Sequence, residues 1–113
     1  MIERGLGYWI DPGGDVVPLP PRASHADLMR ELVRPEQLAD EAADAFVRDP
    51  NAWAVGAGWV RLRIYPGEGV AYADLPPDPS GLPLERVEAL LDAIGIVGLT
   101  LKYTDADGNY VSP

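Results

Sequence analysis

The clearest alternation of hydrophobic and polar positions lies between Gly58 and Tyr65, which reads Gly-Trp-Val-Arg-Leu-Arg-Ile-Tyr. In an extended strand, successive side chains point to opposite faces of the sheet. One face of this segment is therefore aliphatic and consists of Val60, Leu62 and Ile64. The other face places two arginines between two aromatic rings: Trp59, Arg61, Arg63 and Tyr65. The pattern predicts a central strand whose aliphatic face meets the core while its arginines and rings face away.

Other short runs predict two hairpins and one later strand. The expected strands are 6–10, 16–19, 70–75 and 99–103, with 110–111 pairing back. Asp11-Pro12-Gly13-Gly14-Asp15 separates the first two runs, and its Pro and Gly residues are typical of a turn. Prolines from Pro18 onward place this hairpin at a sheet edge, because proline cannot donate to a ladder. The turn signal at Pro66–Gly69 joins the central strand to the run 70–75 in a second hairpin.

Three segments carry apolar residues at the three-and-four spacing of a helix: Ala26–Val33, Glu36–Arg48 and Leu84–Ile94. The first follows Ser24, a suitable N-cap, with Asp27 in capping-box position. Asp49-Pro50-Asn51 is predicted to close the second helix, and the segment 51–57 shows little pattern. Hairpins and helices segregate along the chain, which favours an α+β fold. We predict a single domain, residues 1–113, with an antiparallel sheet built from hairpins and about three helices packed on one face.

Composition indicates a soluble globular chain. Its 113 residues are 47% hydrophobic and 24% charged, which suffices for one modest core without a metal or disulfide. The chain has no cysteine, so disulfides and thiolate metal sites are excluded. The first residues lack the features of a signal peptide, and no window approaches the roughly 18 apolar residues of a membrane span. We therefore expect a cytoplasmic protein without membrane association, in the host cell cytoplasm if it is phage-encoded.

The chain is acidic, with 18 acidic and 9 basic residues and a net charge of −9. Such a surface repels nucleic acid and favours basic partners or simply solubility, so no direct nucleic-acid binding is expected. Acidic residues recur at helical spacing in two groups: Glu36, Asp40 and Asp44, and Glu85, Glu88 and Asp92. Two interpretations stay open: these stripes are solvated outer faces, or they imitate a phosphate backbone and occupy a nucleic-acid-binding groove of another protein.

Residues for catalysis or metal binding are few. His25 is the only histidine, and a lone imidazole needs carboxylate partners to make a metal site and a nucleophile to make a catalytic one. Asp105–Asn109 resembles the start of a calcium loop, but no acidic residue follows at position twelve, so an Asp-Gly turn is favoured. The chain has no Gly-rich phosphate loop before a helix, no nucleophile elbow and no zinc spacing. We predict no catalytic residue, no metal and no cofactor.

Several motifs occur in a particular order: Tyr8-Trp9-Ile10-Asp11-Pro12-Gly13-Gly14, then His25 opening a small helix, then Gly58-Trp59-Val60-Arg61, then the amphipathic helix Leu84–Ile94. This order resembles a short uncharacterised module of bacteriophage and mobile-element proteins. The resemblance spans Tyr8 to about Ile94. It departs near the last helix, where a threonine and a glutamine are expected and the chain has Leu82, Pro83, Leu84 and Glu85. The resemblance implies a phage or mobile-element origin and assigns no catalytic residue.

These patterns together predict a non-enzymatic module that binds a protein partner, as a phage or mobile-element accessory factor that inhibits or modulates a host protein. Two candidate surfaces are Trp59, Arg61, Arg63 and Tyr65, and the acidic set Glu36, Asp40 and Asp44. Trp, Tyr and Arg dominate interface hot spots, although the arginines can equally pair with nearby carboxylates while the rings cover the sheet. The alternatives are a small hydrolase or transferase using His25 with a carboxylate, and a virion structural component. A homo-oligomer is compatible with the sequence.

Overall fold

The computed structural model describes residues 6–77, 84–94, 98–105 and 107–111. These residues form a six-stranded sheet in the order β2-β1-β3-β4-β5-β6. The strands are β1 (Leu6–Ile10), β2 (Val16–Pro18), β3 (Val60–Tyr65), β4 (Val70–Asp74), β5 (Thr100–Thr104) and β6 (Tyr110–Val111). The predicted central strand is β3, which pairs with β1 on one side and β4 on the other.

Strand pairing confirms both predicted hairpins. β1 and β2 are antiparallel with β2 at the edge, and β3 and β4 are antiparallel across the one-turn helix η2 (Pro66–Glu68). β6 pairs back on β5, as predicted for 110–111. β4 and β5, however, run parallel, which the sequence reasoning did not anticipate. A helix, α4 (Leu84–Ile94), lies between them in the chain, and parallel neighbours need such a crossover.

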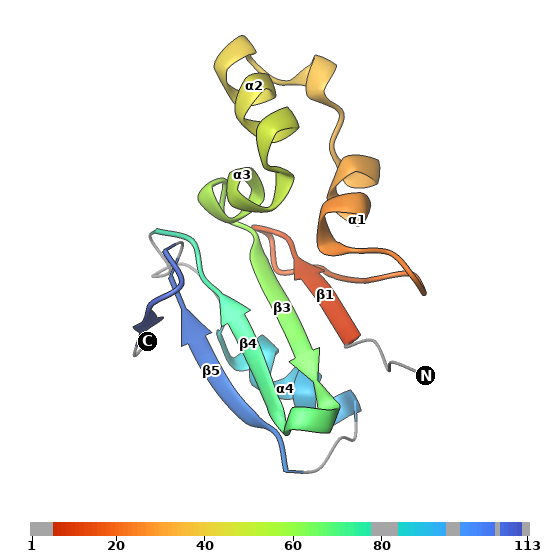
Figure 1. Ribbon diagram of the computed structural model, residues 1–113, viewed down its shortest axis with the longest axis vertical. Helices are drawn as coiled ribbons and strands as arrows, with labels where there is room; N and C mark the ends of the chain where they lie inside the picture. Colours follow the sequence, from red (N-terminus) through yellow and green to blue (C-terminus); the bar gives the residue numbers. More distant parts are fainter. Residues whose placement is uncertain (1–5, 78–83, 95–97, 106, 112–113) are drawn as a thin grey trace.

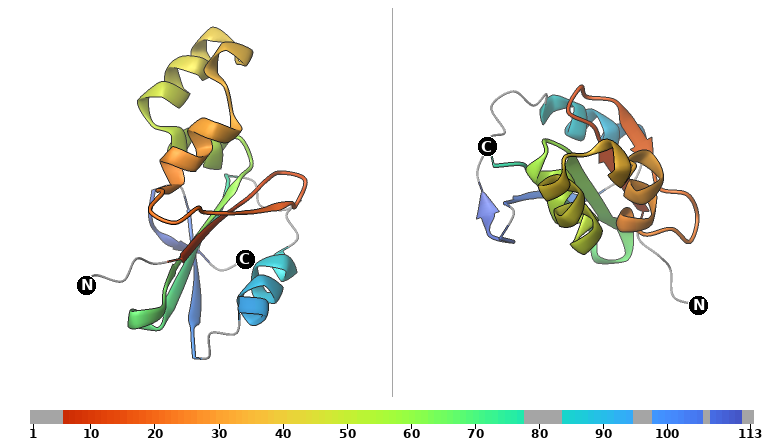
Figure 2. Two further views of the ribbon diagram at one scale, coloured as in Figure 1. Left: turned by 90° about the vertical axis from the view of Figure 1, so that its right-hand side faces the viewer. Right: turned by 90° about the horizontal axis from the view of Figure 1, so that it is seen from above.

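The helices form two groups, as Figures 1 and 2 show. The first group is α1 (His25–Leu32), the one-turn helix η1 (Pro35–Gln37), α2 (Asp40–Arg48) and α3 (Pro50–Gly56), and it lies at one end of the sheet. α4 instead lies across one face of the strands. The α+β class is confirmed, but the helices are not all on one face. Within the described ranges, no helix is both long and apolar enough to cross a membrane.

The predicted helix Glu36–Arg48 is wrong in its extent. Residues 35–37 form η1, and α2 begins only at Asp40. The predicted stop at Asp49 is confirmed. The same residue also caps α3, a helix that the sequence patterns did not predict. Asp49 Oδ1 accepts a hydrogen bond from the Ala52 N–H at 3.2 Å, and Pro50 occupies the first helical turn, where its missing N–H is harmless. The predicted capping box of α1, between Ser24 and Asp27, is present.

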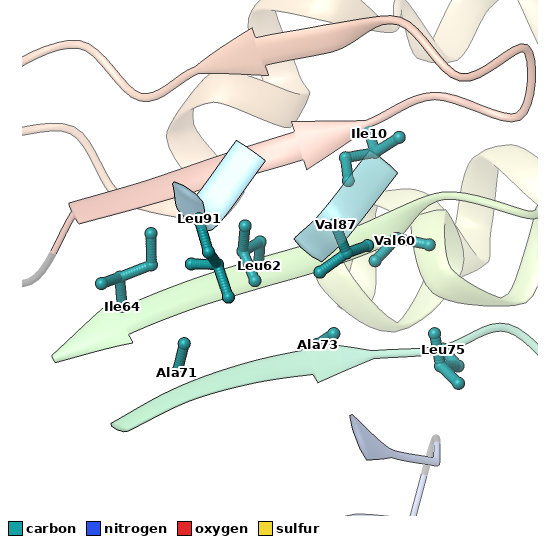
Figure 3. Packing of buried hydrophobic residues seen from close by; sticks show 9 residues of the cluster. All are labelled: Ile10, Val60, Leu62, Ile64, Ala71, Ala73, Leu75, Val87 and Leu91. Carbon is teal, nitrogen blue, oxygen red and sulfur yellow. The ribbon is translucent and has the colours of Figure 1, made fainter. Parts of the chain in front are cut away.

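One hydrophobic cluster fills the space between the sheet and α4. Val60, Leu62 and Ile64 of β3 are buried there, as predicted from their alternation. Figure 3 shows them beside the small residues of β4 and beneath Val87 and Leu91 of α4. Alanines on β4, Ala71 and Ala73, let the helix approach the sheet closely, because they add little bulk.

A second cluster joins the first helix group to the other face of the sheet. Trp9 of β1 is fully buried at its centre, among Leu28, Met29, Phe46, Ala54 and Val55. Its indole Nε1 donates a hydrogen bond to the His25 carbonyl at 2.9 Å, which satisfies the buried N–H. This cluster fixes the position of α1 to α3 over the end of the sheet.

Candidate functional site

The face of β3, β4 and β5 that points away from α4 carries polar and aromatic side chains from all three strands. We call it the open face and define it by Arg61, Arg63, Tyr65, Tyr72, Asp74, Lys102 and Thr104. Strand register places these residues side by side, because Arg61 is opposite Asp74, Arg63 is opposite Tyr72, and Thr104 is beside Asp74. In Figure 1 this face is turned to the viewer, with α4 behind it and the other helices beyond one end.

Asp74 organises the open face. Arg61 Nε donates to its Oδ2 at 2.7 Å, while Arg63 donates from Nε to Oδ2 and from Nη2 to Oδ1, both at 3.0 Å. The Thr104 hydroxyl donates to Oδ1 as well. Asp74 is only 4% exposed. Burial by itself raises the pKa of this carboxyl, but the hydrogen bonds from Thr104 and Arg61 and the positive charges of Arg61 and Arg63 outweigh it, so the pKa lies below its ordinary value.

The arginine pair is only half neutralised. Two guanidinium groups share one carboxylate, and the two side chains remain 25% and 30% exposed for Arg61 and Arg63. The sequence predicts two alternative roles for these arginines, pairing with a nearby carboxylate across strands or contact with a partner. Here the two coexist, because pairing holds the arginines in place without removing them from solvent.

Aromatic rings continue the open face away from the helices. The Arg63 guanidinium lies over the Tyr72 ring, 4.9 Å from its centroid, and the Tyr65 ring meets the Tyr72 ring edge-on at 5.9 Å. Lys102 Nζ lies 5.2 Å from the ring centroid of Tyr110 on β6. Cations and rings therefore alternate across β3, β4, β5 and β6, each in contact with a neighbour.

A pocket of about 450 Å³ opens where the open face meets α3. Arg61, Arg63 and Asp74 line it from the sheet, Asp49 and Asn51 from α3, and Asp105 and Asp107 from the turn between β5 and β6. The turn is the predicted Asp-Gly turn: Asp105 Oδ1 accepts from the backbone N–H groups of Asp107 and Asn109, both at 2.9 Å. The Asn51 side-chain oxygen is buried and has no hydrogen-bond partner in the described residues.

Of the four residues predicted to form one binding surface on the sheet, Trp59 lies apart from the other three. Arg61, Arg63 and Tyr65 lie on the open face, whereas the Trp59 ring packs edge-on against Trp9, 6.1 Å between centroids, in the cluster beneath the helices. Sequence reasoning missed Tyr72, Asp74, Lys102 and Thr104. Tyr72 and Asp74 alternate with apolar residues along 70–75, and Lys102 does so along 99–103, whereas Thr104 lies one residue beyond the predicted strand. Only the register between strands brings these residues to the arginines.

The acidic set Glu36, Asp40 and Asp44 lies on the first helix group. All three residues are exposed, and within the described residues none has an ion pair within 4.0 Å. Asp40 and Asp44 are one turn apart on α2, but Glu36 lies on η1, so the expected stripe along one helix is interrupted. Of the second stripe, Glu88 and Asp92 are exposed on α4, and the Glu85 side chain lies outside the described residues.

His25 has a structural place at the start of α1. Its Nε2 donates to the Leu62 carbonyl at 3.0 Å, and its ring meets Trp9 edge-on at 5.4 Å. Burial lowers the pKa of His25, assisted by the charges of Arg61 and Arg63, and hydrogen bonds to the backbone of Leu62 and Tyr8 oppose the shift. Among the described residues, no group of three His, Cys, Asp or Glu side chains is arranged to hold a metal ion.

Comparison of the chain with protein-family models, with curated proteins and with solved structures gave no match in any of the three. The resemblance to a phage and mobile-element module therefore stays a prediction, and the open face and its pocket are the features of the molecule that bear on function.

Proposed function

We propose that this chain is a non-enzymatic protein-binding module whose partner contacts the open face. The observation that carries the proposal is the bonded placement of arginine and tyrosine side chains on a sheet surface over which, in the described part of the chain, no helix lies. Arginine and tyrosine are enriched in interface hot spots. Ordering a long side chain on binding costs roughly 0.5–1.5 kcal/mol, and Asp74 already orders both arginines.

The charge of the open face favours an acidic protein segment as the occupant. Its charged residues are Arg61, Arg63 and Lys102 with Asp74, which leaves two positive charges on a chain whose net charge is −9. An acidic segment is attracted to this face and repelled by the rest of the surface, so it docks in one place. Nucleic acid is a poorer candidate, because its phosphates extend well beyond the open face onto the negative surface.

The acidic set Glu36, Asp40 and Asp44 is the second candidate surface. Its exposure and its lack of ion pairs in the described residues are what mimicry of a phosphate backbone requires. A phage or mobile-element accessory factor that occupies a nucleic-acid-binding groove of a host protein is the function proposed for this surface. Such a partner is basic, whereas a partner of the open face is acidic, so the two proposals differ in the partner they select.

Two matched variants separate the two surfaces. Tyr65→Ala with Lys102→Glu changes the open face without touching the Asp74 bonds, and Asp40→Lys with Asp44→Lys reverses the acidic face. Each tagged protein is used to capture partners, which are identified by mass spectrometry, purified and titrated directly. We expect the first variant to lose binding of an acidic partner and the second to retain it.

The reverse result, with binding of a basic partner lost only on reversal of the acidic face, would assign the function to mimicry. Binding unchanged in both variants would exclude both surfaces. Circular dichroism and thermal unfolding of each variant show that the fold is retained, so that loss of binding is not loss of structure.

A further inference from the structure

The pocket where the open face meets α3 carries charges of both signs, and we propose that it binds a small dipolar ligand. The ligand's carboxylate meets Arg61 and Arg63, and its cationic group meets Asp49 and Asp107. This inference goes beyond the proposed function, because it concerns a ligand inside the pocket and not a protein on the open face. The volume of about 450 Å³ lies in the range of small-ligand sites.

The carboxylate half rests on the arginine pair. Arg61 and Arg63 both line the pocket, and together they carry one more positive charge than Asp74 neutralises. Asp74 cannot itself turn toward the ligand, because both of its oxygens accept hydrogen bonds from these arginines and from Thr104. Guanidinium groups that are already oriented and still partly exposed are suited to a second carboxylate.

The cationic half rests on carboxylates that have backbone donors at most and no cationic partner among the described residues. Asp49, Asp105 and Asp107 line the same pocket, and among the described residues no cation lies within 4.0 Å of them. The buried oxygen of Asn51, on the α3 wall, lacks a hydrogen-bond donor. An unsatisfied buried acceptor is unfavourable, so a ligand with several N–H donors relieves it when the Asn51 side chain turns toward the ligand.

The sum of charges selects the class of ligand. The lining carries two positive and four negative charges, from Arg61, Arg63, Asp49, Asp74, Asp105 and Asp107. A simple anion is therefore repelled, while a simple cation leaves unmatched the one positive charge of the arginine pair that Asp74 does not neutralise. A ligand with one carboxylate and a donor-rich cation satisfies both ends, and arginine has this chemistry. It can come from free arginine or from the C-terminal arginine of a peptide.

Calorimetric titration of the full chain with L-arginine tests the proposal. Agmatine has the guanidinium but no carboxylate, and glutamate has carboxylates but no side-chain cation. We expect arginine to bind and each of the other two to bind about tenfold more weakly, because each lacks one set of charge-assisted hydrogen bonds. Gly-Gly-Arg and its C-terminal amide distinguish the sources: binding of the peptide acid at least as tight as that of arginine assigns the pocket to a peptide end. Equal binding of agmatine and arginine, or no binding of arginine, overturns the proposal.

A pair of variants supplies the control. Asp49→Asn with Asp107→Asn removes two negative charges from the pocket, and asparagine keeps the N-cap of α3. Asp15→Asn with Asp92→Asn makes the same change in net charge at exposed residues that do not line the pocket. We expect the first pair to weaken arginine binding about tenfold and the second to leave it unchanged. Equal weakening in both pairs would mean general charge attraction and would overturn the assignment to the pocket.

Discussion

The two faces of β3 hold the molecule together in different ways. The face toward α4 is aliphatic, with Val60, Leu62 and Ile64 buried in one continuous cluster (Figure 3). The opposite face depends on directional bonds: two arginines are fixed by one carboxylate and one ring. Hydrophobic burial is non-directional and scales with area, whereas charge-assisted hydrogen bonds fix orientation. The first face therefore supplies most of the stability, and the second supplies a surface of defined geometry.

The largest expected effect is on the aliphatic face. Leu62 is fully buried, so Leu62→Ala removes its contacts and leaves a cavity, which lowers the free energy of unfolding by about 3 kcal/mol. Urea denaturation measures this. Leu32→Ala, at a leucine that is 40% exposed on α1, is the control and should change stability by less than about 1 kcal/mol. Similar losses in the two variants would contradict the division of roles between the faces.

A close contact at the other face gives the next effect. A methyl group at Gly7 would lie 2.7 Å from Cε1 of His25 and closer still to Leu19, so Gly7→Ala must shift these side chains, and the His25 ring is held by its bond to the Leu62 carbonyl. We expect a loss of about 2 kcal/mol in unfolding free energy. Gly67→Ala, where nothing lies within 4 Å, is the matched control and should change stability by less than about 0.5 kcal/mol. A neutral Gly7→Ala would show that α1 is not held against β1 by this contact.

Sequence patterns predicted the aliphatic face well because alternation is a local property. Val60, Leu62 and Ile64 identify one face whatever pairs with the strand. The open face is different: Asp74 is 13 and 11 residues from its arginines and 30 from Thr104. These contacts depend on the register of β3 with β4 and on the parallel pairing of β5, which no local pattern specifies.

The missed helix α3 had a local signal. Asp49 followed by Pro50 is an N-cap followed by proline at the first helical position, and the same two residues also end a helix. The sequence reasoning used only the second meaning. The pocket was missed with it, because its α3 wall is formed by Asp49 and Asn51.

A smaller effect is expected from the bonds of the open face. Asp74→Asn keeps the size of the side chain but leaves two arginines without a negative partner, and we expect a loss of about 1.5 kcal/mol, limited by the solvent that reaches both arginines. Asp92→Asn, at an exposed aspartate on α4, should stay within about 0.5 kcal/mol of the parent.

The same Asp74→Asn variant tests whether fixed arginines matter for binding. If they do, affinity for the partner of the open face falls even under conditions where the variant is fully folded. A loss of stability as large as that of Leu62→Ala would mean that both faces contribute equally to the fold.

The smallest effect expected is a dependence of stability on pH, which arises from His25 and Asp74. The pKa of His25 is below 6.5 in the folded protein, so the unfolded chain takes up its proton first, and stability falls as the pH drops below about 6.5 until it passes the folded pKa. The pKa of Asp74 is below 3.8 when folded, so its contribution is present above about pH 3.8 and is lost only as the pH falls through that lower value.

The decline of stability below about pH 6.5 is the upper step, and the decline below about pH 3.8 is the lower step. Because His25 is the only histidine, the upper step belongs to one side chain and can be removed by one substitution. His25→Gln keeps a donor for the Leu62 carbonyl but has no proton to gain, so the urea midpoints of this variant should stay flat as the pH falls below about 6.5, where those of the parent begin to decline. Asp74→Asn should keep the upper step and weaken the lower one. A parent protein that gained stability over the upper interval would show that His25 is charged in the fold, and that α1 is not held against the sheet by a neutral imidazole.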